Sequence, residues 1–178
     1  MPAVIETPRL TLREFEEADL DALASIYADA EVMRFIGRGG VQTREQARAA
    51  IERERANYAD LGYGEWATVL RETGELIGEC GILRWPDIDG VEEIEVSYLL
   101  AHHAWGRGLG TESATAIRDW GFLELDRDRL VSLIYHDNAA SIGVAIKAGA
   151  SWEKDVTVAG MTVALYVYSR SDGPASRR

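Results

Sequence analysis

A glycine-rich run from Trp105 to Thr111 is the stretch whose residue types point most directly to chemistry. It packs three glycines into five residues, and apolar residues then recur at helical spacing over residues 117–123. A turn that leads into a helix start leaves backbone N–H groups without partners, beside the positive end of the helix dipole. Such a site binds phosphate oxygens. We therefore expect the N–H groups of residues 107–111 to hold a phosphate-bearing ligand, with the Arg107 side chain and the Thr111 hydroxyl as further donors.

Two flanking segments must position this loop. Residues 92–100 alternate and predict a strand, with Ile94, Val96, Tyr98 and Leu100 on one face and Glu93, Glu95, Ser97 and Leu99 on the other. Downstream, Asn138 begins an apolar segment that ends before Gly149, as expected for a helix with an Asn N-cap and a Gly C-cap.

The remaining elements alternate between strands and helices. Strands are predicted at residues 9–15, 65–71, 76–84, 130–135, 152–158 and 161–168, and helices at residues 18–27 and 43–61. Residues 31–40 are expected to be irregular, and Pro86–Gly90 to be a loop. The order predicts one mixed α/β domain over residues 1–170, followed by a polar tail at residues 171–178.

Composition restricts the possible partners. The chain has 178 residues and a net charge of −11, which disfavours a nucleic-acid partner because an acidic surface repels phosphate backbone. It lacks an apolar run long enough for a membrane span, and its start has no apolar signal core. The one cysteine, Cys80, cannot form a disulfide within the chain, so we expect a reducing, cytoplasmic compartment.

Two motifs together carry a resemblance to a known family. The run Trp105-Gly-Arg-Gly-Leu-Gly-Thr-Glu112 resembles the acetyl-CoA pyrophosphate loop of the GNAT N-acetyltransferase superfamily, with a Trp where Gln or Arg is usual. Asn138-Ala-Ala-Ser141, ending in Lys147-Ala-Gly149, is similar to the second motif of its RimJ/RimL branch. The order of elements matches the family from residue 9 to residue 168. The glycine spacing fits neither a dinucleotide-binding fingerprint nor a P-loop.

The resemblance implies a fold and a cofactor. The fold is a mixed twisted sheet of about seven strands, with helices on both faces and a splay between the fourth and fifth strands. The acetyl donor is acetyl-CoA, without a metal, and no His/Cys spacing suggests one. The implied cofactor contacts are the backbone of the fourth strand's end, the loop and the second motif: Leu99, Leu100, Ala101, Trp105, Gly106, Arg107, Gly108, Leu109, Gly110, Thr111, Asn138 and Ser141.

Amide formation from a thioester needs a free amine, a polarised carbonyl and a protonated leaving thiol. Glu95 is the first choice as general base, directly or through water, and the alternative is a solvated carboxylate on an exposed strand face. Many relatives place a Tyr acid where this chain has Ala145, so Ser141 is the candidate that the branch implies. His102, His103 and His136 are weaker candidates, because His residues in loops are more often solvated.

The substrate side is less defined. The resemblance places the acceptor walls at residues 31–41 and 155–163, and Trp85 lies at a strand end where it could line the cleft. We expect an N-acetyltransferase that acts on a protein N-terminal or similar amine by direct transfer in a ternary complex. The alternatives are acetylation of a small amine, such as an aminoglycoside or polyamine, and a CoA-binding domain without turnover. Family members are often homodimers, and the last predicted strand could pair with a second copy.

Overall fold

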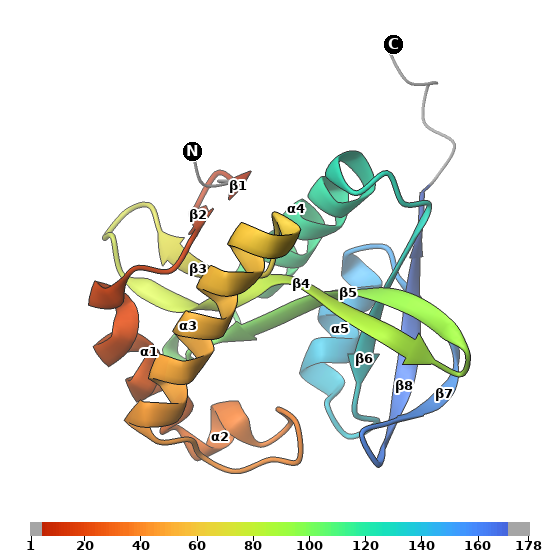
Figure 1. Ribbon diagram of the computed structural model, residues 1–178, viewed down its shortest axis with the longest axis horizontal. Coiled ribbons are helices and arrows are strands. Elements are labelled where there is room, and N and C mark those ends of the chain that lie inside the picture. Colours follow the sequence, from red (N-terminus) through yellow and green to blue (C-terminus); the bar gives the residue numbers. More distant parts are fainter. Residues whose placement is uncertain (1–4, 171–178) are drawn as a thin grey trace.

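An eight-stranded mixed sheet runs through residues 5–170, the part of the chain described by the computed structural model (Figure 1). Its strand order is β1-β2-β3-β4-β5-β6-β8-β7. The strands are β1 (Ile5–Glu6), β2 (Leu10–Arg13), β3 (Glu65–Leu70), β4 (Leu76–Ile88), β5 (Val91–Leu100), β6 (Arg129–Ile134), β7 (Ser151–Val158) and β8 (Met161–Ser169). The helices are α1 (Leu20–Tyr27), α2 (Ala30–Met33), α3 (Arg44–Leu61), α4 (Leu109–Glu124) and α5 (Ala139–Lys147). The tail predicted at residues 171–178 lies outside the described residues.

Seven of these strands match the predicted ones, and the eighth is β1. It consists of two residues that pair antiparallel with β2, through Ile5 with Leu12 and Glu6 with Thr11. Two residues are too short to show the alternation by which strands are found in a sequence. The mixed α/β class and the expected splay are confirmed, and β1 raises the strand count from about seven to eight.

The loop expected at Pro86–Gly90 is a tight hairpin instead. Strand β4 continues to Ile88, and β5 begins at Val91. Asp89 and Gly90 make the turn with φ values of 53° and 83°. Positive φ at both central residues is typical of the two-residue turn that Asp-Gly favours between twisted strands. The prediction was wrong because Pro86 reads as a strand breaker, whereas here it lies at an irregular part of the β4–β5 ladder.

Two groups of helices cover the two faces of the sheet. One face packs α4 and α5 through Leu109, Ile117 and Ala145, which share a core with Trp66 and Leu130. The other face packs α1, α2 and α3, which lie together at one side of Figure 1. Segment 31–40, expected to be irregular, contains most of the short helix α2, because Asp29 accepts a hydrogen bond from the Glu31 N–H at 2.9 Å and caps it.

The sheet opens between β5 and β6, which are parallel. Their register contains one pair, Glu95 with Val131, whereas on its other edge β6 pairs with β8 along its whole length. This is the splay expected between the fourth and fifth predicted strands, which are β5 and β6 here because β1 was not predicted. It leaves the second half of β5 without a ladder partner on one side, and thereby exposes backbone groups to a ligand. No helix within residues 5–170 is long and apolar enough to cross a membrane.

Candidate acyl-transfer site

The glycine-rich loop lies where β5 leads into α4. Gly106 and Gly108 have φ values of 72° and 76°, which L side chains rarely adopt, and Gly108 is the N-cap of α4. The Glu112 N–H makes the first helical hydrogen bond, to the Gly108 carbonyl at 3.1 Å. The N–H groups of residues 109–111 precede it and therefore have no acceptor within the helix. This bare helix start is a cradle that fits a pyrophosphate.

The loop is anchored by Glu112 to the connection between β1 and β2. Its carboxylate accepts hydrogen bonds from the Thr7 hydroxyl at 2.6 Å, the Arg9 N–H at 2.9 Å and the Arg9 Nε at 2.6 Å. Burial opposes its ionisation, but these bonds outweigh burial and hold the pKa of Glu112 below its usual range. Arg9 also donates to the Arg107 carbonyl at 2.8 Å, so one side chain fixes the loop and the helix start.

The open edge of β5 presents only alternate residues to the gap. The Ala101 N–H donates to the Ile77 carbonyl at 2.7 Å, which places Ala101 and Leu99 among the residues that bond to β4. The backbone groups of Tyr98 and Leu100 then face β6, and the Leu100 carbonyl already accepts from the Trp105 indole at 2.7 Å. Three positions, Leu99, Leu100 and Ala101, were expected to pair with pantetheine. The N–H of Leu100 faces the gap, whereas Leu99 and Ala101 bond to β4.

Side chains fill the base of the gap. The Ser132 hydroxyl donates to the Val96 carbonyl at 2.7 Å, and the Leu133 N–H donates to Glu95 Oε1 at 3.2 Å. Both bonds replace ladder hydrogen bonds that β5 and β6 no longer make. Glu95 therefore sits at the point where the two strands separate.

Helix α5 begins beside this gap. Asn138 Oδ1 accepts a hydrogen bond from the Ser141 N–H at 3.2 Å, which confirms the predicted N-cap. The Ser141 carbonyl accepts from the Tyr98 hydroxyl at 2.9 Å, so the helix start is tied to β5. Ala145, which stands where many relatives have a Tyr, is fully buried beneath them.

A cavity of about 290 Å³ joins these elements. Glu95, Asn138 and Ser141 all line it, so the structure brings together the two expected catalytic residues and the expected pantetheine contact. The two segments expected to form acceptor walls also contribute, through Phe35, Ile36 and Gly37 on one side and Val158, Met161 and Val163 on the other.

The Glu95 carboxyl is enclosed. It is 7% exposed, and its Oε2 accepts a hydrogen bond from the Trp85 indole at 2.6 Å. Burial raises the pKa of Glu95 to about 7, against the opposing effect of the bonds from Trp85 and Leu133. A carboxyl with a pKa near neutrality is suited to accept a proton in a reaction near pH 7. The alternative of an exposed, solvated carboxylate is therefore excluded.

Residues that the sequence reasoning did not single out also line the cavity. They include Glu65 on β3, Glu79 on β4, and Ser97 and Tyr98 on β5. The signal for Glu79 was available, because it lies inside the apolar run Leu76–Leu83, where a carboxyl is buried unless the strand is exposed. Trp85, placed at the cleft by its position alone, lies there and bonds to Glu95.

The three histidines are outside this cavity. His102, His103 and His136 are more than half exposed and lie near Asp29, Glu75 and Asp155 respectively. Within residues 5–170, no three His, Cys, Asp or Glu side chains gather as a metal site would require.

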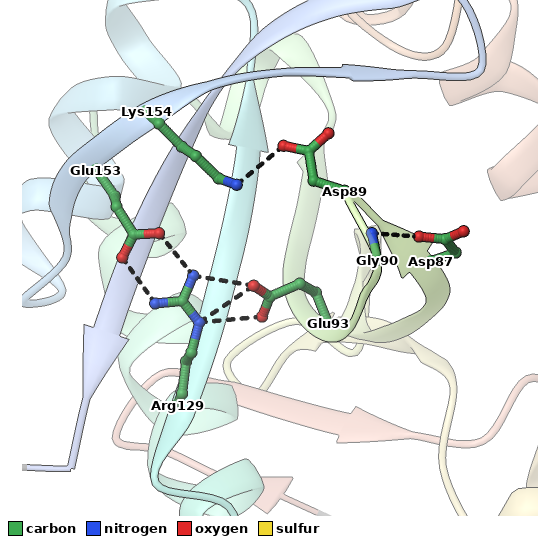
Figure 2. A network of polar contacts seen from close by, with 7 residues as sticks. All are labelled: Asp87, Asp89, Gly90, Glu93, Arg129, Glu153 and Lys154. Atoms are coloured by element: carbon green, nitrogen blue, oxygen red, sulfur yellow. Dashed lines mark hydrogen bonds and ion pairs between the residues drawn. The ribbon is translucent and has the colours of Figure 1, made fainter.

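An ion-pair network holds the far side of the gap (Figure 2). Arg129 at the start of β6 bonds to Glu93 on β5 at 2.9 Å and to Glu153 on β7 at 2.8 Å. Lys154 on β7 bonds to Asp89 in the β4–β5 turn at 2.9 Å. These contacts fix the β7–β8 hairpin, which forms one cavity wall, against the hairpin that carries Glu95.

The fold and the site define an α/β acyltransferase with a phosphate cradle at a splayed sheet. A family model described as an acetyltransferase (GNAT) domain matches residues 9–151, and the chain therefore belongs to the GNAT family of acetyltransferases, which use acetyl-CoA.

The relatives agree with this assignment. The uncharacterized protein YkkB of Bacillus subtilis (strain 168) is 31% identical over 161 residues, which cover 90% of this chain and 92% of YkkB. The crystal structure of an acetyltransferase from Agrobacterium tumefaciens str. C58 has a TM-score of 0.81 at 30% identity, with 96% of each chain covered. RimL, a ribosomal L7/L12 alpha-N-protein acetyltransferase solved with coenzyme A, has a TM-score of 0.73 at 19% identity, covering 94% of this chain and 98% of RimL. The RimL likeness is one of fold.

Proposed function

We propose that this protein transfers an acetyl group from acetyl-CoA to a primary amine by direct attack within a ternary complex. The observation that carries the proposal is the position of Glu95, a buried carboxyl with a pKa of about 7 where β5 and β6 separate, in one cavity with Asn138 and Ser141. A protein N-terminal amine is one acceptor class. A cationic small molecule is the second, and it is favoured by the carboxyls of Glu65 and Glu79 in the same cavity.

The loop and the open strand would position the donor. The N–H groups of residues 107–111 would hold the pyrophosphate, with the Arg107 side chain and the Thr111 hydroxyl as further donors. Asn138 and the backbone of Tyr98 and Leu100 would bind the pantetheine arm. Acetyl-CoA supplies the thioester as acyl donor. The Leu100 N–H, which faces the gap, would polarise the thioester carbonyl there.

Glu95 would take the proton that the amine must lose, directly or through one water. A nitrogen–carbon bond forms as the carbon–sulfur bond breaks, and Ser141 would deliver a proton to the leaving thiolate. The second proton-transfer role falls to Ser141 because Ala145 has no acidic group and Ser141 lines the cavity.

Thiol release from acetyl-CoA tests the proposal across a panel of small amines and N-terminal peptides. We expect release that depends on the amine, with acetylated product of matching amount. Tight CoA binding without release across the panel would contradict transfer and favour a CoA-binding domain.

Asn138→Ala is expected to weaken CoA binding by about fivefold, because a side-chain hydrogen bond is worth about 1 kcal/mol. It also removes the cap of α5, which costs about 1 kcal/mol of stability. The matched variant Asn138→Ser keeps a capping oxygen and loses the amide, so it separates the two effects. Calorimetric titration with CoA and thermal unfolding measure them. CoA affinity unchanged in both variants would exclude the Asn138 amide from the binding site.

Glu112→Gln is expected to weaken CoA binding about threefold to tenfold, because the neutral amide no longer fixes Arg9 and Thr7 to the helix start. Glu124→Gln at the exposed C-terminal end of the same helix is the control, since it removes an equal charge from a residue far from the loop. Equal CoA affinities for the two variants would show that the anchor does not shape the loop.

A further inference from the structure

The cavity wall formed by β3 and β4 carries two carboxyls that the proposed chemistry does not use. Glu65 and Glu79 line it from β3 and β4 and are 8% and 4% exposed. Glu79 Oε1 accepts a hydrogen bond from the Tyr27 hydroxyl at 2.5 Å. Its Oε2 is buried and has no hydrogen-bond partner within residues 5–170. A buried acceptor without a partner is costly, so this atom points to a ligand that donates to it.

Glu65 approaches the same region across a glycine. Its Oε1 accepts from the Ser97 hydroxyl on β5 at 2.7 Å, and the residue between them in the register, Gly81, has no side chain to intervene. The Glu65 side chain can therefore extend from β3 across β4 to reach Ser97 on β5.

The charged side chains that line the cavity do not balance one another. The charged side chains that line the whole cavity are Glu65, Glu79, Glu95 and Arg53. Arg53 donates to Glu54 Oε1 at 2.8 Å, and Glu54 is fully buried behind the cavity. Among residues 5–170 Arg53 is the one cation that lines the cavity, and it is already paired with Glu54, so no ion pair within these residues reaches Glu65, Glu79 or Glu95.

Burial and mutual repulsion act on these carboxyls. Burial and the neighbouring carboxylate of Glu54 raise the pKa of Glu65 to about 7, and burial with the carboxylates of Glu65 and Glu54 raises the pKa of Glu79 well above its usual range, while the Arg53 guanidinium opposes both shifts without cancelling them. A cation between the two groups would relieve both effects, because an opposite charge nearby favours the ionised form.

The register sets the offset along the strands between Glu95 and Glu79, which is the more distant of the two carboxyls. Glu79 lies opposite Leu99 and Glu95 lies opposite Leu83, so the two carboxyls are offset by four residues along β4 and β5. Four residues of strand correspond to roughly 13 Å. A ligand that reaches both ends must be an extended chain rather than a compact monoamine.

We propose that Glu65 and Glu79 bind a second ammonium group of the acceptor while its reacting amine lies at Glu95, which makes the acceptor a linear aliphatic polyamine. This inference rests on the proposed function for the reacting end only. The Tyr27 hydroxyl positions Glu79, and the Ser97 hydroxyl positions Glu65.

Two measurements test the subsite. The first is calorimetric titration of the unmodified protein, without acetyl-CoA, with α,ω-diamines and triamines of increasing length and with monoamines of matched length. We expect the longer polyamines to bind at least about tenfold more tightly than the monoamines, because charged hydrogen bonds are among the stronger ones. Equal affinity for polyamines and monoamines would overturn the subsite. Binding of polyamines without later acetyl transfer would instead overturn the proposed function and leave the subsite standing.

The second measurement is the KM for a polyamine and for a monoamine in Glu79→Gln. The amide preserves size and removes the charge, so we expect KM for the polyamine to rise about tenfold or more while the value for the monoamine stays unchanged. Glu72→Gln, in an exposed turn, is the control for net charge. An equal rise for both amines would contradict the proposal. If Glu79→Gln fails to fold, Glu65→Gln is tested in the same way.

Discussion

Replacing Glu95 by Gln is expected to lower kcat by about 10²–10⁴-fold, the range typical of a lost general base. The amide has the shape of the carboxylate but cannot take the proton that the attacking amine must lose. Affinity for CoA is expected to stay within about twofold, because the residues that hold the cofactor lie on the loop, the β5 backbone and α5. Steady-state turnover and calorimetric titration with CoA measure the two effects.

The variant is expected to fold. It loses one of the two hydrogen bonds accepted from Trp85 and Leu133, which costs about 1 kcal/mol. The pKa of Glu95 is about 7 in the folded protein and 4.5 without the fold, so unfolding releases a proton between these two pH values. The free energy of unfolding therefore falls as pH rises from 4.5 to about 7. Glutamine does not ionise, so above pH 7 the variant avoids this loss of stability. That gain opposes the cost of the lost hydrogen bond.

Glu92→Gln is the matched control for Glu95→Gln. Glu92 lies on the same strand, outside the cavity, and bonds to Arg84 and Arg127 at the surface. It should leave kcat unchanged. Turnover of Glu95→Gln within twofold of the unmodified protein would remove Glu95 as the base.

Gly81→Ala is expected to destabilise the fold by about 3 kcal/mol or more, at the upper end for overpacking a core. A Cβ at this position would lie 2.2 Å from the Gly64 carbonyl oxygen and 2.5 Å from the Glu65 Cα. Both are backbone atoms, so in the variant β3 and β4 must move apart. This movement would strain the hydrogen bond from the Ile82 N–H to the Gly64 carbonyl, which is 3.0 Å long in the unmodified protein. For a chain of this size we expect the midpoint of thermal unfolding to fall by roughly 6–12 °C.

Gly143→Ala is the control for this effect. Gly143 lies inside α5, and a Cβ there meets nothing within 4 Å. Alanine in a helix interior is favoured over glycine by up to about 1 kcal/mol, so thermal stability should stay the same or rise. A similar loss of stability in both alanine variants would show that the close approach at Gly81 has no energetic weight.

Local sequence signals predicted much of this fold. The spacing of Ile117 and Trp120, the cap at Asn138 and the alternation of residues 92–100 each depend on neighbours along the chain, and each element forms where expected. The glycine loop was predicted for the same reason, because positive φ at Gly106 and Gly108 is a local requirement.

What the sequence did not predict depends on contacts between distant residues. The alternation placed Glu95 on a polar face, but Trp85 and the cavity walls enclose it, and its pKa follows from that enclosure. Glu65 and Glu79 meet one cavity only because β3, β4 and β5 pair in this register. The short strand β1 depends on its pairing with β2, which a two-residue pattern cannot reveal.

The pH dependence of kcat/KM for an accepted amine, compared between the unmodified protein and Glu95→Gln, tests the central claim most directly. A base with a pKa of about 7 is protonated below that value, so below pH 7 kcat/KM should fall by a further factor of about ten for each pH unit, in addition to the slope seen above pH 7. The slope that comes from the amine's own titration should remain in both proteins. We predict that the break near pH 7 is lost in Glu95→Gln. A break that persists unchanged in the variant would contradict the account.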